Sequence, residues 1–159
     1  MTQCTLVLGL GNTLLTDEAV GPRTVERMQA EGGARDGIRY LDGGTLSFTL
    51  AAPIAECSRL VVVDAAAMGM PPGTVQVFEG EAMDRQLSLN AKSVHEVSLA
   101  DLLDIARLTD TLPPQRALVG IEPALVDWGS ELTPAVEAAI PEAIARIRGL
   151  LKHWRSQAD

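Results

Sequence analysis

"LVLGLGNTLLTDEAVGPR", residues 6–23, joins an apolar strand pattern to two glycines and the start of a helix. This order of elements is typical of an α/β fold, in which a strand turns tightly into a helix that packs back on the sheet. Two kinds of site suit such a segment. The glycines fit a loop that cradles a phosphate, whereas Asp17 and Glu18 would bring two carboxylates to a site of another kind.

Further strand patterns alternate with amphipathic helix patterns along the chain. The first, third and fifth strand patterns are almost continuously apolar, which is typical of strands covered on both faces. The fourth, TVQVFE, alternates and follows PPG, so we expect it near an edge of the sheet. Strands are predicted at 5–9, 38–42, 59–65, 74–79 and 116–122.

The helix patterns carry their own start and stop signals. Pro53 must shorten or bend the second helix, and Pro141 should kink the last one, because proline removes a hydrogen bond inside a helix. Ser98 is expected to cap its helix together with Asp101, three residues later, in a variant of the capping box. Helices are predicted to begin near Asp17, Thr45, Ser98 and Thr133.

These patterns predict the fold class. The chain is expected to form an α/β fold, a three-layer α/β/α sandwich around a mostly parallel, twisted sheet of about five strands. With 159 residues it is most simply one domain, 1–159.

Composition and charge limit the partners. The formal net charge of −8 argues against nucleic acid, whose binding calls for clustered Lys and Arg. No apolar run approaches the roughly 20 residues that cross a bilayer, and MTQCTLVLGL has no basic region of a signal peptide. We therefore expect a cytoplasmic protein without a membrane partner. Cys4 and Cys57 have no CxxC partner and are expected to be packing residues.

Polar residues follow the predicted strands. In open α/β sheets ligands bind beyond the carboxyl ends of the strands. Side chains that are far apart in the sequence are therefore expected along one rim of the sheet. They are Asn12, Asp17 and Glu18 after the first strand, Asp42 after the second, Asp64 at the end of the third and His95 in the loop KSVHEV.

The opening loop does not fit a phosphate. The dinucleotide fingerprint G-x-G-x-x-G needs a third glycine for close packing of helix on strand, but Leu14 stands at that position. No GK[ST] motif follows. Asp17 and Glu18 at the helix start would repel a pyrophosphate. The two glycines, Gly9 and Gly11, are expected to allow a tight turn.

A metal site fits the rim better. Glu18, Asp64 and His95 offer two carboxylates and one imidazole, and three protein ligands leave positions open for water or substrate. Each residue also has a structural interpretation. Glu18 and Asp17 suit the first turn of a helix, His95 suits a hydrogen-bonded loop, and Asp42 before two glycines suits a turn. Asp64 is harder to explain this way, because a carboxylate that ends an apolar strand is costly unless it is paired or functional.

Five blocks of the sequence, in order, resemble the nickel-iron hydrogenase maturation endopeptidases. The likeness spans about residues 4 to 150. It departs from the commoner family form at Ala19, where that form has glycine. The blocks are LGLGNTLLTDEAVGPRTVE, LDGGT, VVVDAA, SVHEVSLADLL and LVGIEPALVDWGSELTPAVEAAI.

This resemblance implies an endopeptidase that removes the C-terminal extension of a hydrogenase large subunit after nickel insertion. By position, the family's nickel-site residues fall on Glu18, Asp64 and His95, which would also be the catalytic residues. The nickel would come with the precursor, and other divalent metals are expected to substitute. Hydrolysis would be metal-assisted or of the aspartic type, with Asp17 or Glu18 sharing a proton with Asp64. The alternative is a nickel-sensing assembly chaperone that cuts nothing.

Overall fold

The computed structural model describes residues 4–32, 37–45, 47–89 and 98–158, and its sheet has five strands in the order β2-β1-β3-β5-β4. β1, β2, β3 and β5 run parallel, whereas β4 runs antiparallel to β5 at one edge. We call the end where the four parallel strands finish the carboxyl end of the sheet, and the opposite one the amino end. The strands are β1 Thr5–Leu10, β2 Ile38–Gly44, β3 Arg59–Ala65, β4 Val75–Glu79 and β5 Gln115–Ile121.

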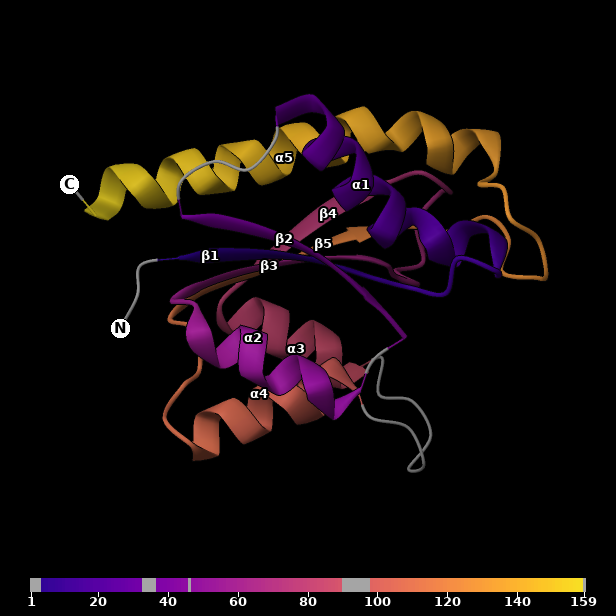
Figure 1. Cartoon of the computed structure of the whole chain (residues 1–159). Coiled ribbons are helices and arrows are strands. Elements are labelled where there is room, and N and C mark those ends of the chain that lie inside the picture. Colours follow the sequence, from indigo (N-terminus) through magenta and orange to yellow (C-terminus); the bar gives the residue numbers. More distant parts are fainter. Residues whose placement is uncertain (1–3, 33–36, 46, 90–97, 159) are drawn as a thin grey trace.

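Helices cover both faces of the sheet. α1 and α5 lie on one face, and α2, α3 and α4 lie on the other (Figure 1). The three-layer α/β/α sandwich predicted from the sequence is therefore confirmed. The helices are α1 Val20–Gly32, α2 Ala51–Glu56, α3 Glu81–Leu89, α4 Leu99–Leu108 and α5 Pro134–Ala158, with short 3-10 turns η1 Thr16–Ala19 and η2 Phe48–Leu50.

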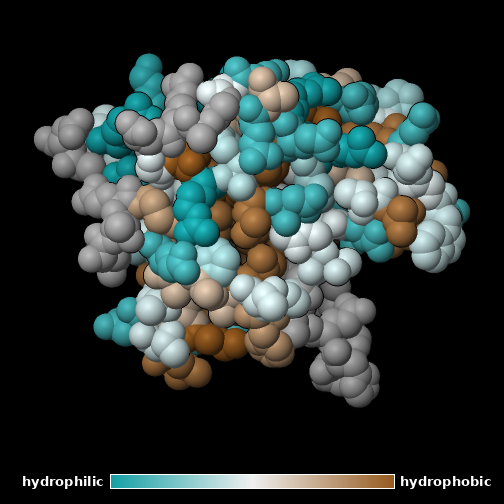
Figure 2. Space-filling view, in the orientation of Figure 1, coloured by the Kyte–Doolittle hydropathy of each residue, from teal (hydrophilic) through white to brown (hydrophobic). Residues whose placement is uncertain are grey.

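Alternate strand residues build two cores. Val7, Val61 and Val119 face α1 and α5, where the apolar stripe of α5 from Val136 to Trp154 is buried. The neighbouring leucines of β1, together with Leu60 and Val62 of β3, face α2, α3 and α4. This period of two is how a strand covered on both faces serves two layers. Figure 2 shows apolar surface in the middle of one side of the molecule, where the edge strand β2 runs between the two helical layers.

The local expectations are met with two differences. β4 lies at an edge, and Ser98 and Asp101 form the capping box. The helix expected from Thr45 is shorter and begins as η2, with Pro53 in the first turn of α2. α5 continues through Pro141 to Ala158, and the kink expected at this proline stays a prediction. α3 was not predicted; it is a short helix in which Met83 is the one buried side chain.

Cys4 and Cys57 form a disulfide, which corrects the expectation that both cysteines are only packing residues. Cys57 follows α2 and lies in the core, as expected. Cys4 precedes β1 and lies beside Cys57, and the Cα atoms of the two cysteines are 4.8 Å apart. The pairing arises because β1 and β3 are neighbours in the sheet, although 53 residues separate the two cysteines. Among the described residues, no helix is both long enough and apolar enough to cross a bilayer.

Candidate active site at the carboxyl end of the sheet

Glycines bring the segment that carries Glu18 onto the sheet. A Cβ at Gly11 would collide with the carbonyl group of Glu18, and the φ of Gly11, +147°, is one that residues with a side chain rarely adopt. A Cβ at Gly21 would collide with the carbonyl oxygens of Leu10 and Val63. The close packing of helix on strand that a third fingerprint glycine would provide is thus supplied by Gly21, inside α1.

Glu18 and Asp64 therefore come from segments that touch. Gly21 packs against the carbonyl of Val63, which is the residue before Asp64. Glu18 belongs to η1 and lies three residues before Gly21. Both carboxylates are half-buried, at the end of β3 and in the turn after β1. The strand-end argument correctly placed two of its three metal-site residues on one rim of the sheet.

The turn that presents Glu18 begins with a strained residue. Thr16 has φ +43°, which is costly for a β-branched side chain. Three hydrogen bonds to the segment after β5 hold it there. The amide of Thr16 donates to the oxygen of Gly129 at 2.9 Å, its hydroxyl donates to the oxygen of Leu125 at 2.7 Å, and the amide of Asp127 donates to that hydroxyl at 3.1 Å. Strain held by its surroundings in this way is typical of functional sites. Ala19 needs no left-handed conformation, so the departure from the family glycine does not disturb the turn.

Asp17 is a structural clamp rather than a reactive group. Its side chain is fully buried. The amides of Ala124 and Leu125 donate to Oδ2 at 2.8 and 3.0 Å, and the amide of Thr133 donates to Oδ1 at 2.7 Å. The hydroxyl of Thr133 lies 3.0 and 2.7 Å from the two oxygens. Asp17 thus ties η1 to the segment after β5 and to the start of α5.

The protonation of Asp17 follows from these contacts. Burial by itself raises the pKa of the Asp17 carboxyl, but the hydrogen bonds from Thr133, Leu125 and Ala124 outweigh it and lower this pKa below its usual value. Both oxygens of Asp17 are thus occupied in holding backbone and hydroxyl donors, which supports a structural role. The version of aspartic-type hydrolysis that uses Asp17 has no support in these contacts and stays a prediction.

Two more carboxylates at this end are structural. Asp42 accepts from the amide of Gly44 at 2.8 Å in a turn, as its default interpretation predicts. Glu122, which sequence reasoning missed, is buried and accepts from the amides of Met68 and Met70 at 2.7 and 3.1 Å. Its position one residue after the apolar strand β5 is the same signal that selected Asp64. Glu122 orders the loop that follows Asp64.

The third metal-site residue of the prediction, His95, lies outside the described residues. Within the described ranges, no group of three His, Cys, Asp or Glu side chains is placed to hold a metal ion. The complete ligand set of Glu18, Asp64 and His95 stays a prediction. His153, the second histidine of the chain, lies on an exposed face of α5.

Comparison with known proteins identifies the family. A family model described as hydrogenase maturation protease matches residues 22–149, which is most of the chain. The chain belongs to the hydrogenase maturation protease family. The matched range contains Asp64 and His95 and begins four residues after Glu18.

Relatives of the hydrogenase maturation protease share both sequence and fold. The hydrogenase 2 maturation protease of Escherichia coli K12 is 37% identical over 148 residues, which cover 92% of this chain and 90% of the relative. The hydrogenase expression/formation protein HoxM of Cupriavidus necator is 33% identical over 150 residues, covering 94% of this chain and 74% of the relative. The solved structure of the hydrogenase maturating endopeptidase HybD from Escherichia coli superposes with a TM-score of 0.88 at 36% identity, covering 95% and 93% of the two chains.

Proposed function

We propose that this hydrogenase maturation protease is an endopeptidase that removes the C-terminal extension of a nickel-iron hydrogenase large subunit after nickel has been inserted. Membership of the family and the relatives named as maturation proteases support the reaction class. The nickel-loaded precursor is the substrate, and its nickel is recognised by Glu18, Asp64 and His95. The cytoplasmic location expected from the sequence belongs to the same proposal.

One observation carries this proposal. The packing of Gly21 on Val63 brings the segments of two half-buried carboxylates, Glu18 and Asp64, together at the carboxyl end of the sheet. α3 ends and α4 begins at this same end of the sheet (Figure 1). Ligands of such folds bind at this end of the sheet.

The donor set fits a divalent ion that is delivered by a substrate. Two carboxylates and one imidazole leave coordination positions open, so a nickel ion that already has ligands in the precursor can still be bound. The ion then raises the occupancy of the docked state, because only a loaded precursor gains these ligands. Zinc, cadmium and other divalent ions are expected to substitute at the same donors.

Hydrolysis needs an activated water near the scissile carbonyl. Either the bound ion lowers the pKa of that water, or the Glu18 or Asp64 carboxylate takes its proton. Asp17 is not available for this task, since its oxygens are saturated by backbone and hydroxyl donors. It acts by holding the turn that presents Glu18.

A cleavage assay with apo and nickel-loaded precursor tests the proposal. Mass spectrometry should show the shortened large subunit only with the loaded precursor. His95→Ala should abolish this product without changing the melting temperature, whereas His153→Ala, a matched change on exposed α5, should cleave normally. Normal cleavage by His95→Ala would remove the histidine from the site. If the loaded precursors bind but none of them becomes shorter, the assembly chaperone would be favoured instead.

Metal exchange separates the two hydrolytic routes. If the ion activates the water, replacing the nickel of the precursor by an ion that binds but is a poor Lewis acid should slow the chemical step and leave the affinity for the precursor unchanged. If the ion serves recognition alone, the affinity should change and the rate at saturation should not.

A further inference from the structure

Exposed apolar side chains gather at the carboxyl end of the sheet. Eight large hydrophobic residues are exposed in the described part of the chain, and only Leu108, where α4 ends, lies at the amino end. Single exposed apolar residues need no explanation, but a concentration in loops at one end marks an interaction site. The other seven are Leu14, Phe48, Met70, Leu125, Val126 and Trp128, which follow β1, β2, β3 and β5, and Leu89, the last residue of α3.

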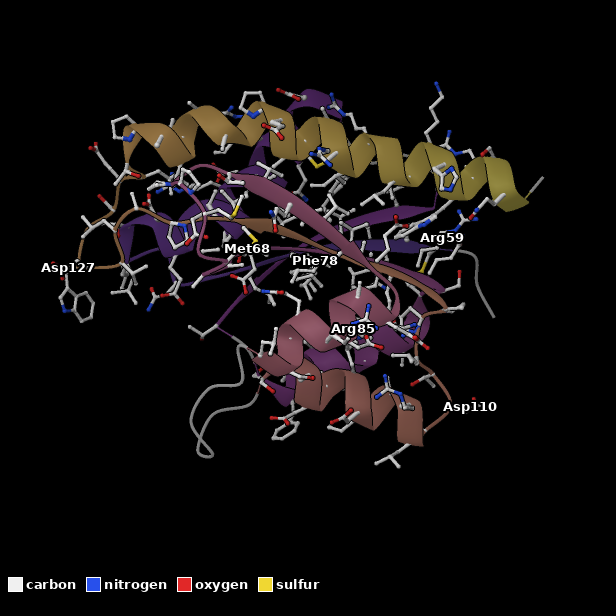
Figure 3. All side chains as sticks on the ribbon, turned by 180° about the vertical axis from the view of Figure 1, so that it is seen from behind. Arg59, Met68, Phe78, Arg85, Asp110 and Asp127 are labelled. Carbon is white, nitrogen blue, oxygen red and sulfur yellow. A yellow bond between two sulfur atoms is a disulfide. The ribbon has the colours of Figure 1, made fainter. Side chains whose placement is uncertain are left out.

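The segment after β5 holds three of these side chains out of the core. We call residues 123–132 the anchor loop; it carries Leu125, Val126 and Trp128. Asp17 and Thr16 bind its backbone through the hydrogen bonds described above, and the amide of Gly129 donates to the oxygen of Leu14 at 2.9 Å. The apolar side chains therefore sit on a backbone that is fixed to the turn carrying Glu18. Figure 3 shows Asp127, in the middle of this loop, at one outer edge of the molecule.

The charge of this end indicates what can dock there. The segments 11–19, 42–50, 64–74 and 122–133 follow or close the four parallel strands, and none of them contains Lys or Arg. Arg23, which belongs to α1 and not to these segments, donates a hydrogen bond to the backbone oxygen of Ser130 in the anchor loop. A partner with positive charge beside its apolar groups is favoured at such a surface. The acidic residues of these segments are Asp17, Glu18, Asp42, Asp64, Glu122, Asp127 and Glu131.

The same charge argues against a second copy of this chain. A symmetric dimer brings the same patch of both subunits together, so each carboxylate would face like charges across the interface. A substrate protein that carries a cation avoids this repulsion. Under the proposed function, the precursor is such a protein, because its bound nickel would lie beside Glu18 and Asp64.

We infer that the anchor loop, together with Leu14, is the docking surface for the hydrogenase large-subunit precursor. Trp128 is the central anchor. It contacts apolar side chains of the precursor that lie next to the metal centre of the precursor. Thr16 and Asp17 fix the distance between this docking surface and Glu18, so that docking also positions the substrate. The inference rests on the proposed function and adds the surface that selects the partner.

The two tryptophans of the chain give a direct test of docking. Trp128 is 78% exposed in the anchor loop, whereas Trp154 is 3% exposed in α5, where its indole donates to Glu79. The protease is labelled with 5-fluorotryptophan, and unlabelled nickel-loaded precursor is added in fluorine NMR. The resonance of Trp128 should shift while that of Trp154 stays in place. Cleavage of the precursor without a shift at Trp128 would overturn the inference.

Steady-state cleavage supplies the second test. Trp128→Ala should raise KM about tenfold or more and leave kcat within about twofold, as expected when an interface anchor is truncated. Leu108→Ala is the matched control and should leave both constants unchanged. An unchanged KM in Trp128→Ala would overturn the docking surface but not the proposed function. Absence of cleavage by the unaltered protein would instead contradict the proposed function.

Self-association is measured on the same samples by sedimentation without precursor. If the precursor and not a second copy occupies this surface, the resonance of Trp128 should not depend on protease concentration. A shift of that resonance on concentrating the protease alone, with a dimer that Trp128→Ala dissolves, would mean that a second copy occupies the surface, and would overturn the inference.

Discussion

At the amino end of the sheet, arginines join the elements. Arg116 binds Asp84 of α3 through two nitrogens at 2.7 and 3.0 Å, Arg107 reaches the same carboxylate at 3.3 Å, and Arg59 donates to Gln115 at 2.7 Å. The disulfide lies at this end too. At the carboxyl end, the segments after the parallel strands contain no Lys or Arg, and Asp17 and Glu122 bind backbone amides instead. Figure 3 shows Arg59 and Asp110 toward the amino end and Met68 and Asp127 toward the other.

The two ends differ in what they leave exposed. Arginine pairs at the amino end neutralise their acidic partners within the protein. Buried carboxylates at the carboxyl end, Asp17 and Glu122, instead order the loops by accepting hydrogen bonds from neutral backbone donors. One end of the sheet is thus used for stability, and the other combines order with an acidic, apolar surface. The predictions below change groups at one end or compare groups from both ends.

The largest effect is expected on cleavage. Asp64→Asn and Glu18→Gln should each reduce kcat/KM for nickel-loaded precursor by about 10³-fold or more, because each removes a proposed ligand of the substrate ion. Asp110→Asn, at the amino end, should stay within about twofold. The measurement is product formation by mass under excess precursor, with melting temperatures to show that the variants fold. Equal losses in all three variants would contradict the difference between the ends.

Reduction of the disulfide should weaken the amino end without affecting catalysis. Closing a loop of this length stabilises a protein by about 4 kcal/mol, mainly through the unfolded chain. Guanidinium unfolding with and without dithiothreitol should show a loss of about this size, while kcat/KM stays constant. The double variant Cys4→Ala with Cys57→Ala should not respond to reductant. A drop in cleavage on reduction, under conditions where the protein stays folded, would show that the two ends are coupled.

Asp17→Asn should cost about 2 kcal/mol of unfolding free energy, because an amide group would face donors that the carboxylate now accepts from. It should also lower cleavage, since the turn carrying Glu18 loses its clamp. Asp84→Asn should lower the free energy of unfolding without changing cleavage. High salt should shrink the effect of Asp84→Asn, whose partners are charged, more than that of Asp17→Asn, whose partners are neutral. Urea unfolding with and without added salt measures both; equal salt dependence would contradict the assignment.

The two carboxylates also predict the acid response. Hydrogen bonding with Arg116 lowers the pKa of Asp84 below its usual value, and the net effect at Asp17 has the same direction. Each group binds protons more tightly in the unfolded chain, so its stabilisation is present above the unfolded pKa of about 3.8 and is lost as pH falls through the folded pKa. Urea unfolding between about pH 6 and pH 2 should show this loss, and each Asn variant should show a smaller one. If neither Asn variant changes the dependence of the unfolding free energy on pH, the two carboxylates are not the source of the acid response.

The smallest effect is expected from a single charge at the carboxyl end. Glu131→Gln should slow association with precursor by about two- to threefold and weaken its salt dependence, because rim charges act mainly on the encounter. Asp104→Asn, near the amino end of the sheet, is the control. Stopped-flow binding at low and moderate salt gives both rates. Identical association rates for the two variants would argue against electrostatic steering toward the carboxyl end.

Local signals in the sequence predicted much of this molecule. The apolar runs of β1, β3 and β5 required cover on both faces, and the alternation of β4 placed it at an edge. Ser98 and Asp101 form their capping box because its partners lie three residues apart. The strand-end rule placed Glu18 and Asp64 on one rim. The disulfide and Glu122 were missed, because their partners lie more than 50 residues away in the sequence.

Asp17 and Glu18 show where the sequence alone stops. The sequence by itself determined the layers, the strand positions and the acidic character of the rim, since burial patterns and strand ends are local properties of the chain. Its local signals gave Asp17 and Glu18 the same structural interpretation, and only the family resemblance distinguished Glu18. The tertiary structure decided that Asp17 is buried and Glu18 is not, because the donors that satisfy Asp17 lie 107 to 116 residues further along and reach it only when β5 lies in the sheet.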